Sequence, residues 1–421
     1  MMHTKSIYFP SLQNVQEAAE NLKGVASKTP LSENRNLSKQ FNANIFFKRE
    51  DLQVVRSYKI RGAYNKISFL NDDQKQRGIV CASAGNHAQG VALSCKLIAI
   101  KGTIFMPSTT PNQKIEQVKM FGEAFIDIII EGDTFDDAFA AAQKECRAKN
   151  KTFIHPFNDE KVIEGQATVG LEILEQTSEK IDYVFVPVGG GGLSAGLSSV
   201  FQNLSPETKI IGVEPEGAPS MLTSINNKIN TSLDKIDPFV DGAAVKKVGD
   251  LNFEICQKNL AQMVTVPEGK ICQAILDLYN KDAIVAEPAG ALSIAALDLF
   301  ADEIIGKNVV CVVSGSNNDI TRTAEIKERA LLFASLKHYF IVKFPQRAGA
   351  LKEFVVDILG PNDDITHFEY TKKSNRTNGA AVVGLQLKAS KDLLPLIQRM
   401  KENNFFGDYL NDKPDLFQFL V

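Results

Sequence analysis

The feature that most constrains this chain is a regular alternation of short apolar runs with longer helical patterns between residues 44 and 330. The apolar runs have the length of strands and are continuous, so we expect them to be buried on both faces of parallel sheets. This alternation predicts an α/β fold, in which ligands bind at the carboxyl ends of the strands. The predicted strands are 44–48, 79–82, 103–106, 124–130, 183–188, 209–213, 263–266 and 308–313.

The pattern changes after about residue 333. The remaining segment reads as a βαββαβ unit, which has the size of a small separate domain. We therefore predict one domain at 1–333, with a smaller lobe at about 54–155 inserted in a larger one, and a second domain at 337–421. The predicted elements of the second domain are strand 337–344, helix 351–359, strands 364–371 and 380–388, helix 393–403 and strand 415–421.

Composition and charge exclude several classes of protein. The 421 residues include 47 basic and 50 acidic side chains, and this balance argues against a protein that binds nucleic acid or an anionic membrane. No apolar run approaches the ~20 residues that span a bilayer, and the N-terminus lacks a secretory core. The cysteines and histidines are scattered rather than clustered as metal ligands. We expect a cytoplasmic protein with no bound metal.

Two turns carry residues that suit nucleophilic and anion-binding chemistry. Lys59, in the segment SYKIRGA, falls near a predicted helix start, where the helix dipole disfavours its protonated form. Such a lysine can be a neutral amine that forms a Schiff base. Asn86, in SAGNHAQG, is a good N-cap with Gln89 as its capping-box partner, and the small residues 82–85 leave backbone N–H groups free for a carboxylate. A solvated lysine and an ordinary capped helix are the alternatives.

A third turn, at residues 189–192, places four glycines between an apolar strand and a helix. Glycines let the backbone wrap a phosphate, and the helix start offers further donors. Gly190, Gly192 and Ala195 also fit the dinucleotide fingerprint GxGxxA, and Glu214 stands where a ribose-binding acid would lie. An NAD-dependent dehydrogenase is therefore an alternative, although it leaves the first two turns unexplained.

The segments SYKIRGA, SAGNHAQG, GGGGLSAG and SGSNN, in this order, resemble those of the fold-type II pyridoxal-phosphate enzymes, and among them the threonine and serine dehydratases. The resemblance covers nearly all of residues 10–330 and implies a tryptophan synthase β-like fold, with two α/β lobes and parallel sheets. It implies that Lys59 holds pyridoxal phosphate as a Schiff base and acts as the general base, while Ser314 faces the pyridine nitrogen. Further implied contacts are Asn86, Gly189, Gly190, Gly191, Gly192 and Leu193 for the cofactor, and Ser83, Ala84, Gly85, His87 and Glu287 for the substrate.

The resemblance also implies a reaction, in which L-threonine loses water and yields 2-oxobutanoate and ammonia. Serine dehydration and serine racemisation within the same family are alternatives, as is a non-catalytic amino-acid sensor. Serine racemases of this family carry a divalent metal in the turn after the strand that ends in Glu214. Ser220 stands where that pattern has an aspartate, so we expect no metal there.

The tail resembles the ACT-like regulatory domain of biosynthetic threonine dehydratases. At residues 344–351 a strand runs into a helix, and a small amino acid could place its carboxylate on the helix start near Arg347 and Gly349. The resemblance implies isoleucine as the effector and a place at the first step of isoleucine biosynthesis. A purely oligomerising domain is the alternative. We expect a homo-oligomer, either a dimer or a tetramer.

Overall fold

The computed structural model describes residues 8–370, 378–413 and 415–417. The chain divides into two compact units, Met1–Thr321 and Arg322–Val421. The first unit contains two sheets and the second contains one. Within the described residues, no helix has the length and apolar character needed to cross a bilayer.

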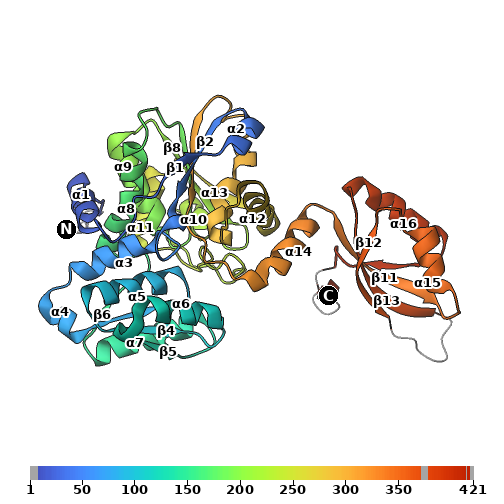
Figure 1. The fold of residues 1–421 in the computed structure, drawn as a ribbon, viewed down its shortest axis with the longest axis horizontal. Helices are drawn as coiled ribbons and strands as arrows, with labels where there is room; N and C mark the ends of the chain where they lie inside the picture. The colour runs from blue at the N-terminus through green and yellow to red at the C-terminus, as the bar shows by residue number, and fades with distance from the viewer. Residues whose placement is uncertain (1–7, 371–377, 414, 418–421) are drawn as a thin grey trace. The chain divides into compact units, whose positions relative to one another are not determined.

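The larger sheet of the first unit has six strands. They are β1 (Leu31–Glu33), β2 (Asn44–Arg49), β7 (Tyr183–Pro187), β8 (Lys209–Pro215), β9 (Gln262–Val266) and β10 (Asn308–Val313). They lie in the order β1-β2-β10-β7-β8-β9, and all pairs are parallel except β1 with β2. Helices α8 (Glu160–Glu175) and α9 (Gly192–Leu204) pack on one face, while α13 (Pro288–Ala295) packs on the other (Figure 1).

The smaller sheet has four parallel strands in the order β5-β4-β3-β6. They are β3 (Ile79–Ala82), β4 (Gly102–Met106), β5 (Ile126–Ile130) and β6 (Thr152–Phe153). Alternate residues of β3 face opposite helices: Ile79 and Cys81 pack with α5 (Asn86–Ile98), whereas Val80 and Ala82 pack with α7 (Phe135–Ala148). We call this sheet with its helices the small lobe and the rest of the first unit the large lobe.

All eight predicted strands of the first unit are present. The expected burial on both faces was wrong for two of them, and two further strands were not predicted. The edge strands β5 and β9 are only partly buried, because each has one neighbour in its sheet. Strands β1 and β6 were not predicted, since three and two residues are too short to show a pattern. The remaining helices of the unit are α1 (Leu12–Asn21), α2 (Arg35–Phe41), α3 (Lys59–Ser68), α4 (Asp72–Arg77), α6 (Asn112–Gly122), α10 (Ser220–Asn227), α11 (Asp250–Asn259) and α12 (Glu268–Asp282), with short turns η1 (Glu50–Leu52), η2 (Glu123–Phe125), η3 (Leu297–Phe300) and η4 (Ile320–Arg322).

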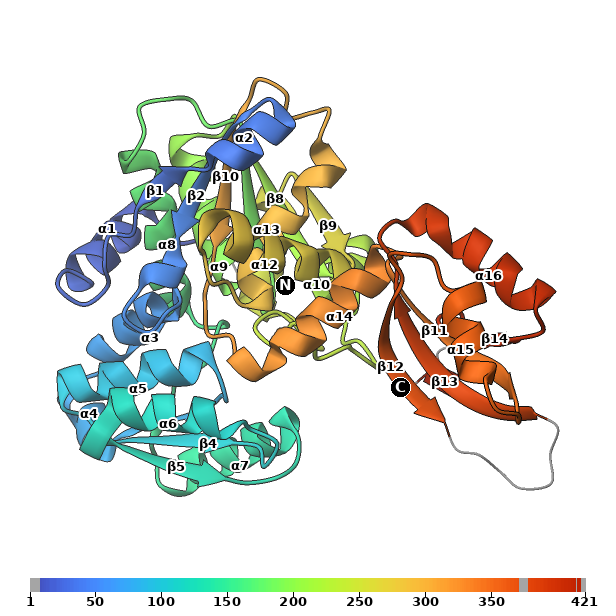
Figure 2. The same ribbon diagram turned by 45° about the vertical axis from the view of Figure 1, so that its right-hand side comes forward.

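Helix α3 lies between the two lobes, where it packs against α5 on one side and α8 on the other (Figure 2). Its first turn is held by a buried ion-pair network. The Arg61 guanidinium, 1% exposed, donates to both carboxylate oxygens of Glu50 at 2.8 Å and to those of Glu172 at 2.7 and 2.9 Å. Lys48 Nζ also donates to Glu172, at 2.6 Å. The network fixes the start of α3 on the large lobe.

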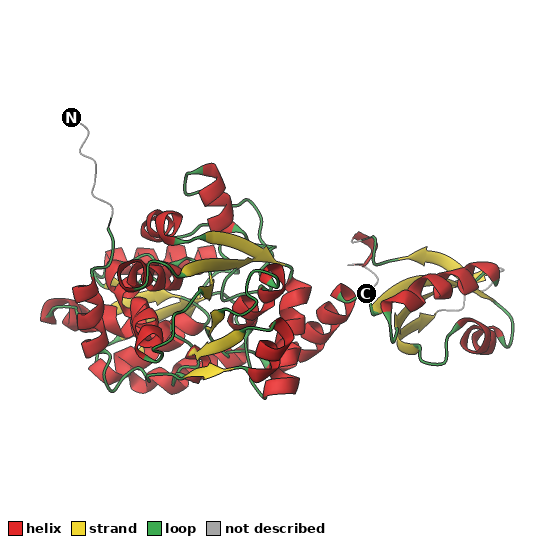
Figure 3. Cartoon of the chain, turned by 90° about the horizontal axis from the view of Figure 1, so that it is seen from above, coloured by secondary structure: helices red, strands yellow, loops and turns green. Residues whose placement is uncertain are grey.

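The second unit is a four-stranded antiparallel sheet in the order β12-β13-β11-β14, preceded by α14 (Thr323–Phe333). Its elements in chain order are β11 (Lys337–Pro345), α15 (Ala350–Glu353), η5 (Phe354–Ile358), β12 (Asp364–Tyr370), β13 (Asn378–Gln386), η6 (Ser390–Asp392), α16 (Leu393–Glu402) and β14 (Phe406–Tyr409). The inward residues of β11 and β13 share one core with α16 and η5. Figure 3 shows the strands and helices of this unit coloured by secondary structure.

This βαββαβ order is the one predicted, but the last strand is not where we expected it. The apolar run directly after α16 supplies β14, which pairs with β11 and closes the sheet. Residues 415–417 form a helical turn instead of a strand, and 418–421 lie outside the described residues. Both segments carry aromatic residues, so their composition did not distinguish them, whereas the pairing of β14 with Phe340, Ile341 and Val342 of β11 does.

We predict that Arg61→Ala lowers the free energy of unfolding by about 3–5 kcal/mol, because it leaves Glu50 buried and without its partner. Urea denaturation of the full chain measures the loss. Arg77→Ala is the matched control, since Arg77 pairs with the exposed Asp73 and should cost less than about 1 kcal/mol. Equal losses in the two variants would contradict a special role for the buried network.

Candidate active site

The carboxyl ends of the parallel strands in both lobes bring the predicted site residues together. Backbone contacts join the segments that follow β2 and β10: Ser57 forms a bridge with Gly315, and the Tyr58 N–H donates to the Ser314 carbonyl at 3.2 Å. The turn after β6 in the small lobe reaches the same place, because the Lys59 side chain contacts it. Residues far apart in the sequence therefore line one site at the lobe boundary.

Lys59 is the first residue of α3, as the apolar spacing predicted. Its Nζ donates to the Pro156 carbonyl at 2.9 Å. Desolvation by the surrounding protein lowers the pKa of Lys59 to about 8, and the nearby Glu287 carboxylate acts in the opposite direction. The position thus favours a neutral, nucleophilic amine far more than a surface lysine does.

Asn86 is the first residue of α5, not its N-cap, and the predicted capping box is absent. Gly85 is the N-cap, and the Gln89 amide donates to Gln117 instead. The Asn86 side chain is used across the lobes: its Nδ2 donates to Glu287 Oε1 at 2.6 Å, and its Oδ1 accepts from the Asn317 amide. A tertiary partner has displaced the local cap that the sequence offered.

Glu287 lies at the N-cap of α13 and is 4% exposed. Its Oε2 accepts from the Asn317 N–H at 3.1 Å, and its own N–H donates to the Gly315 carbonyl. Burial, reinforced by the charge of Asp241, raises the pKa of Glu287 to about 7. Its carboxyl group therefore gains or loses a proton near neutral pH, within reach of Asn86 and in the field of Lys59.

The glycine segment after β7 leaves no room for side chains. A Cβ on Gly190 would lie 2.2 Å from the Phe157 ring, and one on Gly189 would lie 2.9 Å from Ala243 Cα. Gly191 has φ +86°, the left-handed region that favours glycine, and is the N-cap of α9. Leu193 follows in the first turn of α9, whose leading N–H groups have no acceptor within the helix. The segment is a backbone cradle suited to a phosphate.

Ser314 follows β10 directly and is buried. Its hydroxyl donates to the Ala289 carbonyl at 3.3 Å, a long contact that leaves its oxygen able to accept a hydrogen bond. Three buried side-chain atoms of other residues around the site have no hydrogen-bond partner among the described residues: Ser57 Oγ, His87 Nδ1 and Asn317 Oδ1. Unsatisfied polar atoms of this kind are costly unless a ligand completes them.

The turn after β3 contributes through helix α5 more than through its small residues. The N–H groups of Ser83 and Gly85 are engaged, with the Phe105 carbonyl and the Ser83 hydroxyl respectively, and Ala84 lies between them. The donors that remain are the Ala84 N–H and the first amides of α5, since the opening N–H groups of a helix have no acceptor within it. The His87 ring pairs through Nε2 with the Ile154 carbonyl at 3.0 Å, and burial lowers the pKa of His87 to about 3, so its ring is neutral.

Glu214, the proposed ribose ligand of the dehydrogenase alternative, is not available to a nucleotide. It is fully buried, and its two carboxylate oxygens accept from the N–H groups of Met221 and Leu222 at 2.7 and 2.9 Å. Ser220 lies in the turn that carries a divalent metal in serine racemases, and its hydroxyl donates to the Val245 carbonyl. Both side chains are satisfied within the protein.

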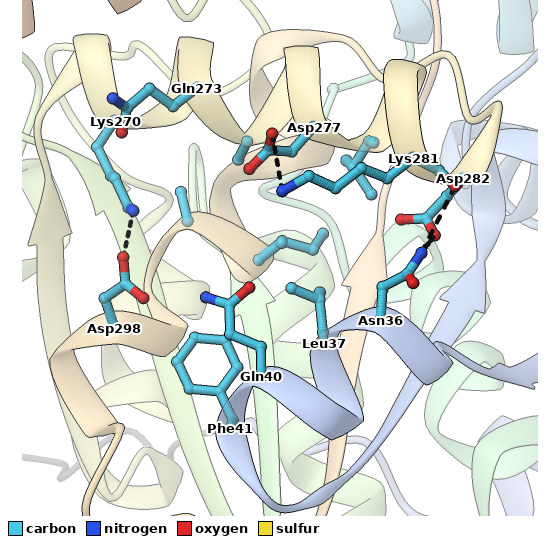
Figure 4. Close-up of a pocket in the computed structure, with 14 residues that line it drawn as sticks. Asn36, Leu37, Gln40, Phe41, Lys270, Gln273, Asp277, Lys281, Asp282 and Asp298 are labelled. Carbon is cyan, nitrogen blue, oxygen red and sulfur yellow. Dashed lines mark hydrogen bonds and ion pairs between the residues drawn. The ribbon is translucent and has the colours of Figure 1, made fainter. Parts of the chain in front are cut away.

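A pocket of about 160 Å³ lies elsewhere, between α2 and α12, and none of the predicted site residues lines it (Figure 4). Its charged groups are paired with one another: Lys281 with Asp277 at 3.1 Å, and Lys270 with Asp298. Because none of the residues predicted for catalysis or cofactor binding lines it, this pocket does not compete with the lobe boundary as an active site.

In the second unit, Arg347 and Gly349 lie in the turn after β11, as expected. The Arg347 guanidinium is exposed and pairs with Glu353. Gly349 has φ +87° and is the N-cap of α15. The turn has an accessible cation beside a helix start.

Sequence reasoning missed two contributors to the site. Phe157 packs against Gly190, and Asn317 bridges Asn86 to the backbone at Val55. Asn317 stands inside the SGSNN segment and could have been found there. Phe157 belongs to no pattern that the sequence makes visible.

Comparison with known proteins identifies both units. Residues 22–315 match the family described as pyridoxal-phosphate dependent enzyme, and residues 328–420 match the C-terminal regulatory domain of threonine dehydratase. The L-threonine dehydratase biosynthetic IlvA of Halalkalibacterium halodurans is 55% identical over 411 residues, which cover 97% of this chain and 99% of the relative. That of Bacillus subtilis is 55% identical over 410 residues, 97% of each chain.

Solved structures give the same picture. The processed form of threonine deaminase isoform 2 from Solanum lycopersicum has a TM-score of 0.72 at 38% identity, covering 76% of this chain and 95% of that one. Maize serine racemase has a TM-score of 0.71 at 29% identity, covering 77% and 98% respectively.

We predict that covalent trapping of pyridoxal phosphate on Lys59 by borohydride rises with pH and is half-maximal near pH 8, because the neutral amine is the reactive form. In Glu287→Gln the midpoint should fall, since loss of the carboxylate removes the charge that favours the protonated amine. Glu216→Gln, at an exposed position, is the control and should leave it unchanged. A wild-type midpoint near the ordinary lysine value of 10.5 would contradict the desolvated environment.

Proposed function

The chain belongs to the pyridoxal-phosphate dependent enzymes, in the threonine dehydratase family, and from that premise we propose that it deaminates L-threonine to 2-oxobutanoate and ammonia. The observation that carries the proposal is a lysine amine of lowered pKa at the boundary of two lobes, close to a glycine cradle. Threonine dehydration with pyridoxal phosphate needs both a nucleophilic lysine and a phosphate site. The dehydrogenase alternative is not supported, because the Glu214 carboxylate is already bound by two backbone N–H groups and is not accessible to a ribose.

The residues present fit pyridoxal phosphate. The 189–192 backbone, together with Leu193, would hold the phosphate, and Lys59 would hold the cofactor covalently. Asn86 and Ser314 would contact the ring, where buried polar atoms without partners support a polar ligand. When bound, pyridoxal phosphate withdraws electrons from the substrate Cα and so makes its proton acidic.

The chain's own groups then carry out positioning and proton transfer. Lys59 Nζ, with its lowered pKa, takes the Cα proton as general base. The first amides of α5, together with Ser83 to His87, would hold the substrate carboxylate at the positive end of that helix. The neutral His87 ring adds no competing charge. Glu287 orients Asn86 through their 2.6 Å hydrogen bond.

The second unit supports regulation by a small molecule. We propose that the segment 337–421 is a regulatory domain joined to a catalytic domain at 1–333, that isoleucine is its effector, and that the chain assembles into a homo-oligomer in the cytoplasm. The match of residues 328–420 to a threonine dehydratase regulatory domain supports the effector role. The exposed Arg347 beside Gly349 supports an amino-acid carboxylate as the recognised group.

We predict that Lys59→Ala lowers the rate of ammonia release from threonine by at least about 10³-fold, because it removes both the covalent attachment and the general base. The assay compares threonine with serine, each with and without isoleucine. Lys66→Ala, on the same helix but paired with Asp159, should retain activity. Full turnover by the Lys59 variant would refute the mechanism, and wild-type binding of isoleucine without any turnover would favour the sensor alternative.

For the regulatory unit we predict that Arg347→Ala raises the isoleucine concentration for half-inhibition by about tenfold, the effect of losing one charge-assisted hydrogen bond. The rate without isoleucine should not change. Lys391→Ala, an exposed cation elsewhere in the unit, serves as the comparison. Unaltered isoleucine sensitivity in the Arg347 variant would place the effector carboxylate elsewhere.

A further inference from the structure

The buried side chain of Asn252, which lies outside the four sequence segments that define the site, forms a hydrogen bond with the glycine segment 189–192. Asn252, on α11, is 0% exposed. Its Nδ2 donates to the Gly190 carbonyl at 2.6 Å and to the Phe157 carbonyl at 3.1 Å. Both neighbours are acceptors, so the NH₂ side of the amide faces them and each of its hydrogens has a use, while the buried Oδ1 has no hydrogen-bond partner among the described residues.

The hydrogen bond from Asn252 to the Gly190 carbonyl sets the direction of the Gly191 N–H. Its carbonyl also accepts from the Gly249 N–H at 3.1 Å, so the oxygen is fixed on the α11 side. In a planar trans peptide the N–H of the following residue points away from that carbonyl. The Gly191 N–H must therefore point away from α11, and the left-handed φ of +86° at Gly191 then turns the chain into α9.

The second hydrogen bond of Asn252 reaches the other side of the site. Phe157, whose carbonyl it binds, packs its ring on Gly190 and its backbone on Gly192. The preceding carbonyl, of Pro156, accepts from Lys59 Nζ. One amide therefore holds the phosphate cradle and the segment beside the reactive lysine in a fixed relation.

We propose that Asn252 is a positioning residue for the cofactor phosphate, which orients the Gly190–Gly191 peptide so that its N–H faces the phosphate. The inference rests on the proposed function, because it concerns the same cofactor. Asn252 itself touches neither the substrate nor the reacting atoms. Its hydrogen bond to the Gly190 carbonyl acts on the phosphate end of the site, and a loss of affinity that depends on the phosphate distinguishes it from a residue that simply supports the fold.

The test compares two ligands of the cofactor-free full chain, pyridoxal phosphate and pyridoxal, which lacks the phosphate. Asn252→Asp keeps the shape but replaces the donor by an acceptor and adds a negative charge. Asn252→Ala, which removes the donor without adding charge, is therefore measured beside it and must show the same selectivity. We expect each variant to weaken pyridoxal phosphate by about tenfold to a hundredfold, and pyridoxal by less than about threefold. Visible absorbance gives both dissociation constants. Asn259→Asp, the same change on the same helix, should leave both constants within about threefold.

Other outcomes are decisive. Equal weakening of both ligands, or no weakening of pyridoxal phosphate, would overturn the proposal. If the Asp variant does not fold, Asn252→Ala alone decides, and failure of both to fold would assign Asn252 to the fold instead. Failure of the unmodified chain to bind pyridoxal phosphate at Lys59 would refute the proposed function itself. Wild-type binding with an indifferent Asn252 variant would refute only this inference.

Discussion

The active site depends on a charge that is buried and fully matched. Arg61 stands two residues after Lys59 on α3, and its guanidinium is satisfied by two carboxylates of the large lobe. A buried guanidinium tolerates few other arrangements, since loss of either partner leaves a charge in a medium that solvates it poorly. The ion pairs hold the start of α3 on the large lobe, and the Lys59 amine beside it is held by its hydrogen bond to the Pro156 carbonyl.

A second principle is division of labour between backbone and side chain. In the proposed site, glycine N–H groups, which carry no net charge, would bind the cofactor phosphate. The titratable groups nearby are Lys59 and Glu287, and their pKa values of about 8 and about 7 put both within reach of physiological pH. The turn that contains Pro156 and Phe157 connects Lys59 to the glycines, because the Pro156 carbonyl accepts from Lys59 and Phe157 packs on Gly190.

The sequence was most informative where a signal is local. Continuous apolar runs revealed the strands, and four glycines between a strand and a helix revealed the cradle. The reading was wrong where a distant residue decides the outcome: Asn86 looked like a cap, but its amide is taken by Glu287, 201 residues away. Asn252 and Phe157 carry no local signature in the sequence. Their contacts form only in the folded chain, where the Asn252 amide donates to the carbonyls of Gly190 and Phe157.

The hydrogen bond between Asn86 and Glu287 joins the small lobe to the large one at a separation of 2.6 Å. Hydrogen bonds of this kind weaken beyond about 3.2 Å. A tilt of the small lobe by a fraction of an ångström at this point would release the amide, while leaving each hydrophobic core undisturbed. The hydrogen bond between Asn86 and Glu287 is therefore far more sensitive to a rigid-body displacement of one lobe than the hydrophobic packing within either lobe.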